Sequence, residues 1–135
     1  MRSDTRSATL DAPPDQVFDY LADPMNLPTW AVGFARAVRR SGDAWLVTTG
    51  HGEVGLRVAA NATLGTIDFH MTPAPGVTVS AYSRVLASHD GSEYVFTQFQ
   101  APGMPDAAFE AQIATLREEL TVLQSIVRAR TACPS

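Results

Sequence analysis

Residues 105–128 read PDAAFEAQIATLREELTVLQSIVR and carry the strongest structural signal in the chain. Apolar side chains recur there every three or four positions, which is the spacing of one helix face. These side chains are Phe109, Ile113, Leu116, Leu120, Leu123 and Val127, with Val122 and Ile126 widening the stripe. Asp106 lies in the first turn and Arg128 near the last, where each charge favours the helix dipole. The stretch therefore predicts one amphipathic helix about 36 Å long.

The residues before this helix alternate between apolar and polar side chains instead. The alternation is clearest over residues 54–60 and 66–71, and it is typical of strands with one buried face. Glycine-containing turns separate the runs, which favours antiparallel neighbours joined by hairpins. The expected strands span residues 5–10, 35–40, 44–49, 54–60, 66–71, 77–85 and 92–100.

Two short helices are expected between the first strand and the second. The pair Pro13-Pro14 suits the first turn of a helix, and apolar residues follow it at helical spacing. Asp23 precedes a proline, and such residues avoid the helical region, so this helix ends there. Residues 26–30 are expected to form a second helical turn that carries Trp30.

A sheet with one apolar face and a long amphipathic helix bury their apolar surfaces against each other. The sequence therefore predicts an α+β fold, in which a curved antiparallel sheet of six to seven strands surrounds a long C-terminal helix. No linker or repeat divides residues 1–135, so we expect a single domain. A curved sheet cannot close completely around a straight helix, and we therefore expect a gap that the two short helices partly plug.

The composition limits the classes of function. The chain has 135 residues, 45% of them hydrophobic, and a formal net charge of -4. An acidic chain has no general attraction to nucleic acid or anionic lipid, so no nucleic-acid partner is expected. No stretch approaches the ~18 apolar residues of a membrane span, and residues 1–6 lack the apolar core of a signal peptide. We therefore expect no stable membrane insertion. Cys133 is the single cysteine, so no internal disulfide can form, which suits a reducing cytoplasm.

Several patterns that resemble cofactor or catalytic motifs do not hold in their context. Residues 50–55 read GHGEVG and match a dinucleotide-binding pattern, but a strand follows where that motif needs a helix. The three histidines lack metal-ligand spacing, so neither a metal nor a cofactor is expected. Asp68 and His70 share the strand face that should be wet, which favours a solvated polar pair over a catalytic one.

Four segments resemble a known family. Residues 11–23 read DAPPDQVFDYLAD and residues 26–30 read NLPTW, and both resemble the opening of SRPBCC domains, the START-like superfamily. Residues 90–97 read DGSEYVFT, and together with the terminal helix they also match this pattern. The resemblance extends from about residue 5 to residue 127. It implies the Bet v 1-like helix-grip fold, in a superfamily that includes lipid carriers and polyketide cyclases.

The resemblance transfers no catalytic residues, because members of the bacterial polyketide-cyclase-like branch share no universal triad. The inward strand positions and the face of the terminal helix supply candidate ligand-binding residues instead, and Trp30, Phe34 and Met104 are expected at the mouth of the cavity. These are Trp30, Phe34, Trp45, Leu56, Ile67, Phe69, Met71, Ala81, Ser83, Tyr94, Phe96, Gln98, Met104, Phe109 and Ile113. Their polar members are informative, since a buried polar group without a partner costs about 1–3 kcal/mol. Such groups persist where they bond water, each other or a ligand.

Two functions from different classes are open at this point. The favoured hypothesis is binding of a small hydrophobic molecule, lipid-like or aromatic, with a homodimer left open. The alternative is a polyketide cyclase or dehydratase-like enzyme that uses the same cavity, with Tyr94, Gln98 and Ser83 moving protons. A third hypothesis is an interaction protein whose interior is filled, and it requires a void well below the ~300 Å³ where ligand pockets begin.

Overall fold

The computed structural model describes residues 1–132, so Cys133 lies outside the described residues. Within this part of the chain, seven strands form one antiparallel sheet in the order β1-β7-β6-β5-β4-β3-β2. The strands are β1 (Ser3–Leu10), β2 (Ala37–Ser41), β3 (Ala44–Thr49), β4 (Gly52–Asn61), β5 (Thr66–Ala74), β6 (Val77–Ser88) and β7 (Gly91–Phe99). The prediction of six to seven antiparallel strands is confirmed.

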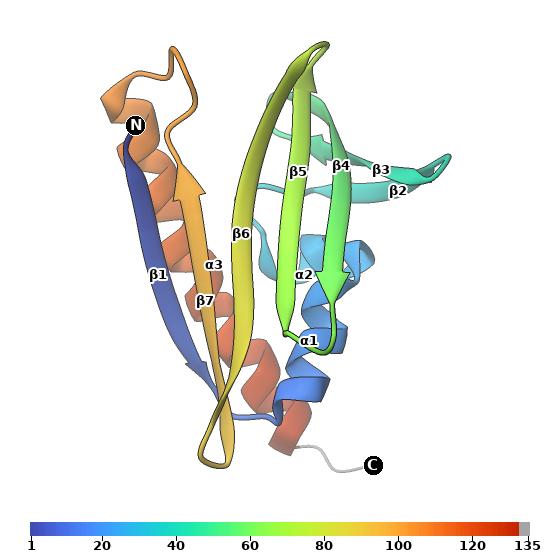
Figure 1. The fold of residues 1–135 in the computed structure, drawn as a ribbon, viewed down its shortest axis with the longest axis vertical. Coiled ribbons are helices and arrows are strands. Elements are labelled where there is room, and N and C mark those ends of the chain that lie inside the picture. The colour runs from blue at the N-terminus through green and yellow to red at the C-terminus, as the bar shows by residue number, and fades with distance from the viewer. Residues whose placement is uncertain (133–135) are drawn as a thin grey trace.

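The helices lie on the concave side of this sheet. They are α1 (Pro14–Ala22), a 3₁₀ turn η1 (Pro24–Asn26), α2 (Leu27–Trp30) and the long α3 (Asp106–Ala132). Figure 1 shows α3 behind β1 and β7, and α1 and α2 behind β4 and β5. In the same view β2 and β3 run across the picture whereas β1, β7 and β6 run along it, so the sheet is strongly curved (Figure 1). The predicted α+β helix-grip architecture is confirmed.

The segment with the short helices crosses from one edge of the sheet to the other. It connects β1 and β2, which are the two edge strands. α1 begins at Pro14, where proline lacks only an N–H that the helix would leave unpaired. It ends at Ala22, and the next residue, Asp23, is extended and accepts the backbone N–H of Met25 with its side chain at 3.0 Å. The chain therefore turns sharply into η1 and α2 beneath the sheet.

Two local details differ from the prediction. The segment of residues 73–76 was expected to be a loop, but β5 continues to Ala74 through a register shift between Met71 and Ala74. A bulge at that point accommodates Pro73, which cannot donate to the ladder. The β6–β7 hairpin lies where expected, but its positive φ falls on His89, at 50°, and not on a glycine.

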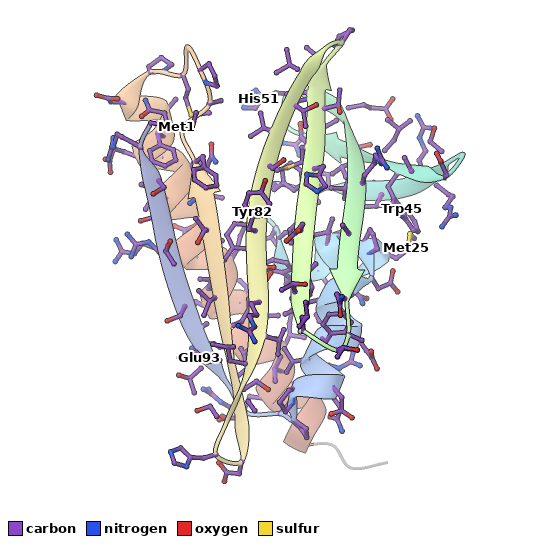
Figure 2. All side chains as sticks on the ribbon, viewed as in Figure 1. Met1, Met25, Trp45, His51, Tyr82 and Glu93 are labelled. Atoms are coloured by element: carbon purple, nitrogen blue, oxygen red, sulfur yellow. The ribbon has the colours of Figure 1, made fainter. Side chains whose placement is uncertain are left out.

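The strand alternation correctly assigns the inner and outer faces of the sheet. Val47, Leu56, Ile67 and Tyr94 are at most 1% exposed and point toward the helices. On the outer face the His70 Nδ1 atom lies 2.8 Å from Ser80 Oγ, and Tyr82 is exposed beside it (Figure 2). The stripe of α3 predicted to be apolar is also the buried one, from Phe109 to Val127.

Candidate ligand-binding cavity

A cavity of about 430 Å³ lies between the sheet and α3. It exists because α3 packs mainly along β1 and against α2, and no helix packs closely on β4 or β5. Its walls come from strands β4 to β7, the β3–β4 turn, the N-terminal half of α3 and residues 27–34, which we call the α2 segment. Small residues enlarge it from both sides, Ala81 on β6 and Ala108 and Ala111 on α3. The walls are mostly apolar.

Eight of the fifteen candidate residues line this cavity. They are Trp30, Phe34, Leu56, Phe69, Met71, Ala81, Phe96 and Gln98. Their shared property is an inward position on β4 to β7 or a place on α2 or just after it. Trp30 is 2% exposed, so it lies in the wall and not at the mouth where the sequence placed it.

The other seven candidates lie outside the cavity lining. Ile67, Tyr94, Phe109 and Ile113 are buried among other core side chains. The two on α3 belong to the apolar stripe, of which Leu116 lines the cavity, whereas the Phe109 ring lies 5.2 Å from the Arg2 guanidinium before β1. Tyr94 packs edge-on against Trp30, with ring centroids 6.3 Å apart.

The remaining three make contacts of their own within the fold. The Ser83 hydroxyl donates to the Ile67 carbonyl at 2.7 Å, so its burial is explained without a ligand. The Arg40 guanidinium lies 5.0 Å from the centre of the Trp45 ring, on the β2–β3 side of the molecule. Met104 lies before α3, and its carbonyl accepts the Gln100 Nε2 donor at 2.7 Å.

Glu119 is a cavity residue that the sequence analysis missed. It lies on α3, is 6% exposed and lines the cavity. Its Oε2 atom accepts the backbone N–H of Gly33 at 3.1 Å. All five ion pairs of the described residues involve other carboxylates, so Glu119 has no arginine partner in that part of the chain. A buried carboxyl without a cation is costly in its charged form.

Burial raises the pKa of Glu119 from its ordinary 4.5 to about 7. The backbone amides of Gly33 and Phe34 oppose this rise, and the charge of Glu118 adds to it. The Glu119 carboxyl therefore exchanges its proton near neutral pH. Perturbed acids of this kind in a cleft are characteristic of functional sites.

A signal for Glu119 exists in the sequence. Ala108, Gln112, Thr115 and Glu119 each come one residue before a member of the apolar stripe, and all four line the cavity. They form a second stripe about 100° around the helix from the first. Residues of this stripe are small or polar, unlike those that fill a core, and this difference distinguishes a cavity wall from a packed face.

Gly33 allows the segment after α2 to approach this second stripe closely. A Cβ atom at Gly33 would collide with the Thr115 Cγ2 atom and would lie 3.6 Å from Glu119 Oε2. The absence of a side chain therefore brings the Gly33 N–H within hydrogen-bonding distance of the carboxyl group.

Two further donors in the cavity wall lack partners within residues 1–132. They are the Trp30 Nε1 and Gln98 Nε2 atoms, both fully buried. Gln98 uses its Oε1 atom to accept from Gln112 Nε2 at 2.9 Å, so its amide group is fixed to α3. The Tyr94 hydroxyl also lacks a partner of good geometry in the described residues, but it lies outside the cavity lining.

The described residues offer neither a metal site nor a membrane-spanning helix. Among residues 1–132, no three His, Cys, Asp or Glu side chains lie together as metal ligands would. None of the helices in that range combines the length and apolar character needed to cross a bilayer. The only other titratable side chain on the cavity lining in this range is His51, which is exposed on the β3–β4 turn (Figure 2).

A strongly curved sheet around one long helix, with a hollow between them, defines the helix-grip class of proteins. The chain belongs to the polyketide cyclase / dehydrase and lipid transport family, whose sequence model matches residues 1–128. No curated protein sequence matches the chain.

Solved structures with the same fold have low sequence identity. The protein XoxI from Bacillus cereus is 16% identical, with a TM-score of 0.77 over 94% of this chain and 96% of that one. The di-domain ARO/CYC protein BexL is 19% identical, with a TM-score of 0.77 over 99% of this chain and 48% of BexL. The Aha1 dimer from Colwellia psychrerythraea is 13% identical, with a TM-score of 0.72 over 94% of this chain and 96% of that one.

Proposed function

We propose that this protein binds a small hydrophobic molecule, lipid-like or aromatic, in the cavity between α3 and strands β4 to β7. The observation that carries this proposal is the cavity itself, about 430 Å³ in volume. Ligand pockets range over about 300–1,000 Å³ and combine apolar walls with a few polar groups. The walls provided by Leu56, Phe69, Met71 and Phe96 have this character, with Gln98 and Glu119 as the polar groups.

The uncharged dye N-phenyl-1-naphthylamine tests this proposal, because its fluorescence rises in apolar surroundings. Ala111 and Ala114 are both exposed positions on α3, but Ala111→Leu places a larger side chain on the cavity lining, whereas Ala114→Leu makes the same change outside it. Both are helix-compatible substitutions on α3. We expect Ala111→Leu to weaken dye binding by about tenfold or more, and Ala114→Leu to leave it unchanged. Equal affinities in the wild type and both variants would place the dye elsewhere.

An enzyme of the cyclase or dehydratase type is the second candidate, and the Glu119 carboxyl group favours it. With a pKa of about 7, this group can both accept and return a proton near neutral pH. In such a reaction the carboxylate would take a proton from the carbon between two carbonyls and leave an enolate. The enolate carbon would attack another carbonyl of the same chain, and the protonated acid would return its proton to the resulting alkoxide. The carboxylate would then take the second proton from the same carbon and pass it to the hydroxyl group, which leaves as water while a C=C bond forms.

This enzymatic role places the proton transfer on Glu119 and not on Tyr94 or Ser83, which lie outside the cavity lining. The test is the cyclisation of a linear chain with several 1,3-related carbonyls. The absorbance of the aromatic ring that forms measures the rate. Glu119→Gln should lower kcat by about a hundredfold or more while the chain still binds. A variant that keeps its full kcat would remove Glu119 from the chemistry.

Three sequence-based expectations stay predictions. They are a single domain over residues 1–135, a cytoplasmic location and a homodimer as one possible assembly. Light scattering of the purified chain distinguishes a monomer of 14.5 kDa from a dimer directly.

A further inference from the structure

Two uncharged polar side chains of α3 carry oxygen atoms on the cavity lining. Gln112 and Thr115 lie three residues apart on the helix, so their side chains are neighbours on one of its faces. Both are half-buried, and both line the cavity. Glu119, the next polar residue of the same stripe, accepts the backbone N–H of Gly33 instead. Gln112 and Thr115 are therefore the uncharged polar groups that α3 presents to a ligand.

The Thr115 hydroxyl is not used by the described part of the fold. Helical hydroxyls commonly donate to the carbonyl four residues earlier, as those of Thr121 and Ser125 do on α3, at 3.1 Å and 3.3 Å. The Thr115 Oγ1 atom has no hydrogen-bond partner within residues 1–132, and the Thr115 methyl carbon is the atom that faces Gly33. The unpaired polar atoms that are fully buried in this range belong to other residues, so Thr115 Oγ1 keeps accessible surface.

The Gln112 amide group leaves an acceptor open beside this hydroxyl. Its Nε2 atom donates to Gln98 Oε1 at 2.9 Å, which ties the amide to β7. The Gln112 Oε1 atom can only accept, and no donor among residues 1–132 reaches it. It is also absent from the fully buried unpaired atoms of that range. The pair thus offers one hydroxyl and one acceptor, both accessible.

We propose that the cavity selects hydrophobic ligands that carry a hydroxyl group, which donates to Gln112 Oε1 and accepts from the Thr115 hydroxyl. This selectivity deepens the proposed binding function and rests on it. The preferred ligand class is then an aromatic or aliphatic alcohol, and not a hydrocarbon or an ether.

The physical reason is the water that a ligand must displace. Accessible polar atoms bond water until a ligand takes its place. A purely apolar ligand removes this water and leaves Thr115 and Gln112 without partners in apolar surroundings, which is unfavourable. A ligand hydroxyl both donates and accepts, so it reproduces the bonds that the water made. An ether oxygen only accepts, so it satisfies Thr115 and leaves Gln112 unpaired.

Three uncharged probes of similar size separate the donor from the acceptor. 2-Naphthalenemethanol carries a hydroxyl group, 2-methoxynaphthalene carries an oxygen that only accepts, and 2-ethylnaphthalene carries neither. Displacement of N-phenyl-1-naphthylamine measures each affinity in the wild type and in each variant. The alcohol affinity is compared with the hydrocarbon affinity in the same variant, which cancels the hydration of the probes and any general change in cavity shape.

Substitutions on α3 assign the preference to particular atoms. Thr115→Val removes the hydroxyl and keeps the methyl group that faces Gly33, so the alcohol-to-hydrocarbon affinity ratio should fall about fivefold or more. Thr115→Ser keeps the hydroxyl and should keep the preference. Thr121→Val makes the same change at an exposed position outside the lining and should leave the ratio unchanged. Gln112→Met removes the acceptor, so the alcohol should lose its advantage over the ether.

Each result bears on a different part of the proposal. An alcohol-to-hydrocarbon ratio that is equal in the wild type and Thr115→Val overturns the selectivity but leaves hydrophobic binding intact. The selectivity is likewise overturned if the wild type binds the ether as tightly as the alcohol. If neither the dye nor any of the three probes binds the wild type, the proposed binding function is wrong, and the selectivity with it.

Discussion

The Glu119 carboxyl group titrates near neutral pH because its position combines burial with the absence of a cation. Its pKa is raised to about 7, so the ionised form is unfavourable in the folded protein at neutral pH. A residue that lowers stability in this way is expected at functional sites, where local consistency gives way to chemistry.

A first prediction concerns the pH dependence of stability. The pKa of Glu119 is about 7 in the folded protein and ordinarily 4.5. The folded state therefore holds more protons than the unfolded state between these values, and its stability must fall as the pH rises through this window. The total loss is on the order of 3 kcal/mol.

Urea denaturation at several pH values measures this loss. The wild type should lose unfolding free energy between about pH 4.5 and about pH 7 relative to Glu119→Gln, and the difference should level off above that range. Glu118→Gln should track the wild type, because Glu118 is exposed. Parallel curves for the wild type and Glu119→Gln would show that the carboxyl group is not desolvated.

A second prediction concerns the Tyr94 hydroxyl. It is fully buried without a partner of good geometry in residues 1–132, and burial raises its pKa so that it stays neutral. Tyr94→Phe should therefore leave the unfolding free energy unchanged or raise it by about 1–2 kcal/mol. Tyr82→Phe, at a 44% exposed position, serves as the control. A loss above about 1 kcal/mol in Tyr94→Phe would reveal a hydrogen bond in solution.

At the level of elements, the contact between the α2 segment and α3 positions the polar wall of the cavity. Gly33 and Thr115 touch there, and the Gly33 N–H reaches Glu119. A third prediction follows, that Gly33→Ala costs about 1–3 kcal/mol of unfolding free energy through overpacking.

A double-mutant cycle tests this contact. Thr115→Ala removes the methyl group that the new Cβ would meet, so Gly33→Ala in that background should cost much less than it does alone. Additive costs would contradict the close approach and assign the effect to the backbone.

The sequence predicts the elements well because hydrophobic periodicity is local. The period of two over residues 54–60 and the period near 3.6 over residues 105–128 both appear as β4 and α3. Strand parity likewise places Phe69, Ala81 and Gln98 on the inner face. The positions of Phe109 and Ile113 were not predictable in this way, since the rotation of α3 relative to the sheet depends on its contact with β1.

Polar partners depend on contacts that periodicity does not report. Ser83 was a candidate for contact with a ligand, but its hydroxyl bonds the Ile67 carbonyl on the neighbouring strand, a pairing set by the β5–β6 register. Glu119 was overlooked because a carboxylate next to an apolar stripe is normally solvated. The α2 segment that covers it is distant in sequence.

At the scale of the whole molecule, the cavity follows from where α3 lies. The helix α3 packs along β1 and against α2, and the curved sheet continues past it to β4 and β5, on which no helix packs closely. The hollow of about 430 Å³ is therefore a consequence of the architecture and not of one missing side chain.

The most direct test is nuclear magnetic resonance of the labelled protein with methyl 2-naphthoate. If the molecule lies between α3 and the sheet, its ring protons should show nuclear Overhauser effects to the methyl groups of both Ala81 and Ala111, on opposite walls. Contacts to the Trp30 indole should accompany them. Contacts only to exposed apolar residues such as Met25 or Leu64, or no contacts at saturating ligand, would contradict the proposal that this cavity is a container.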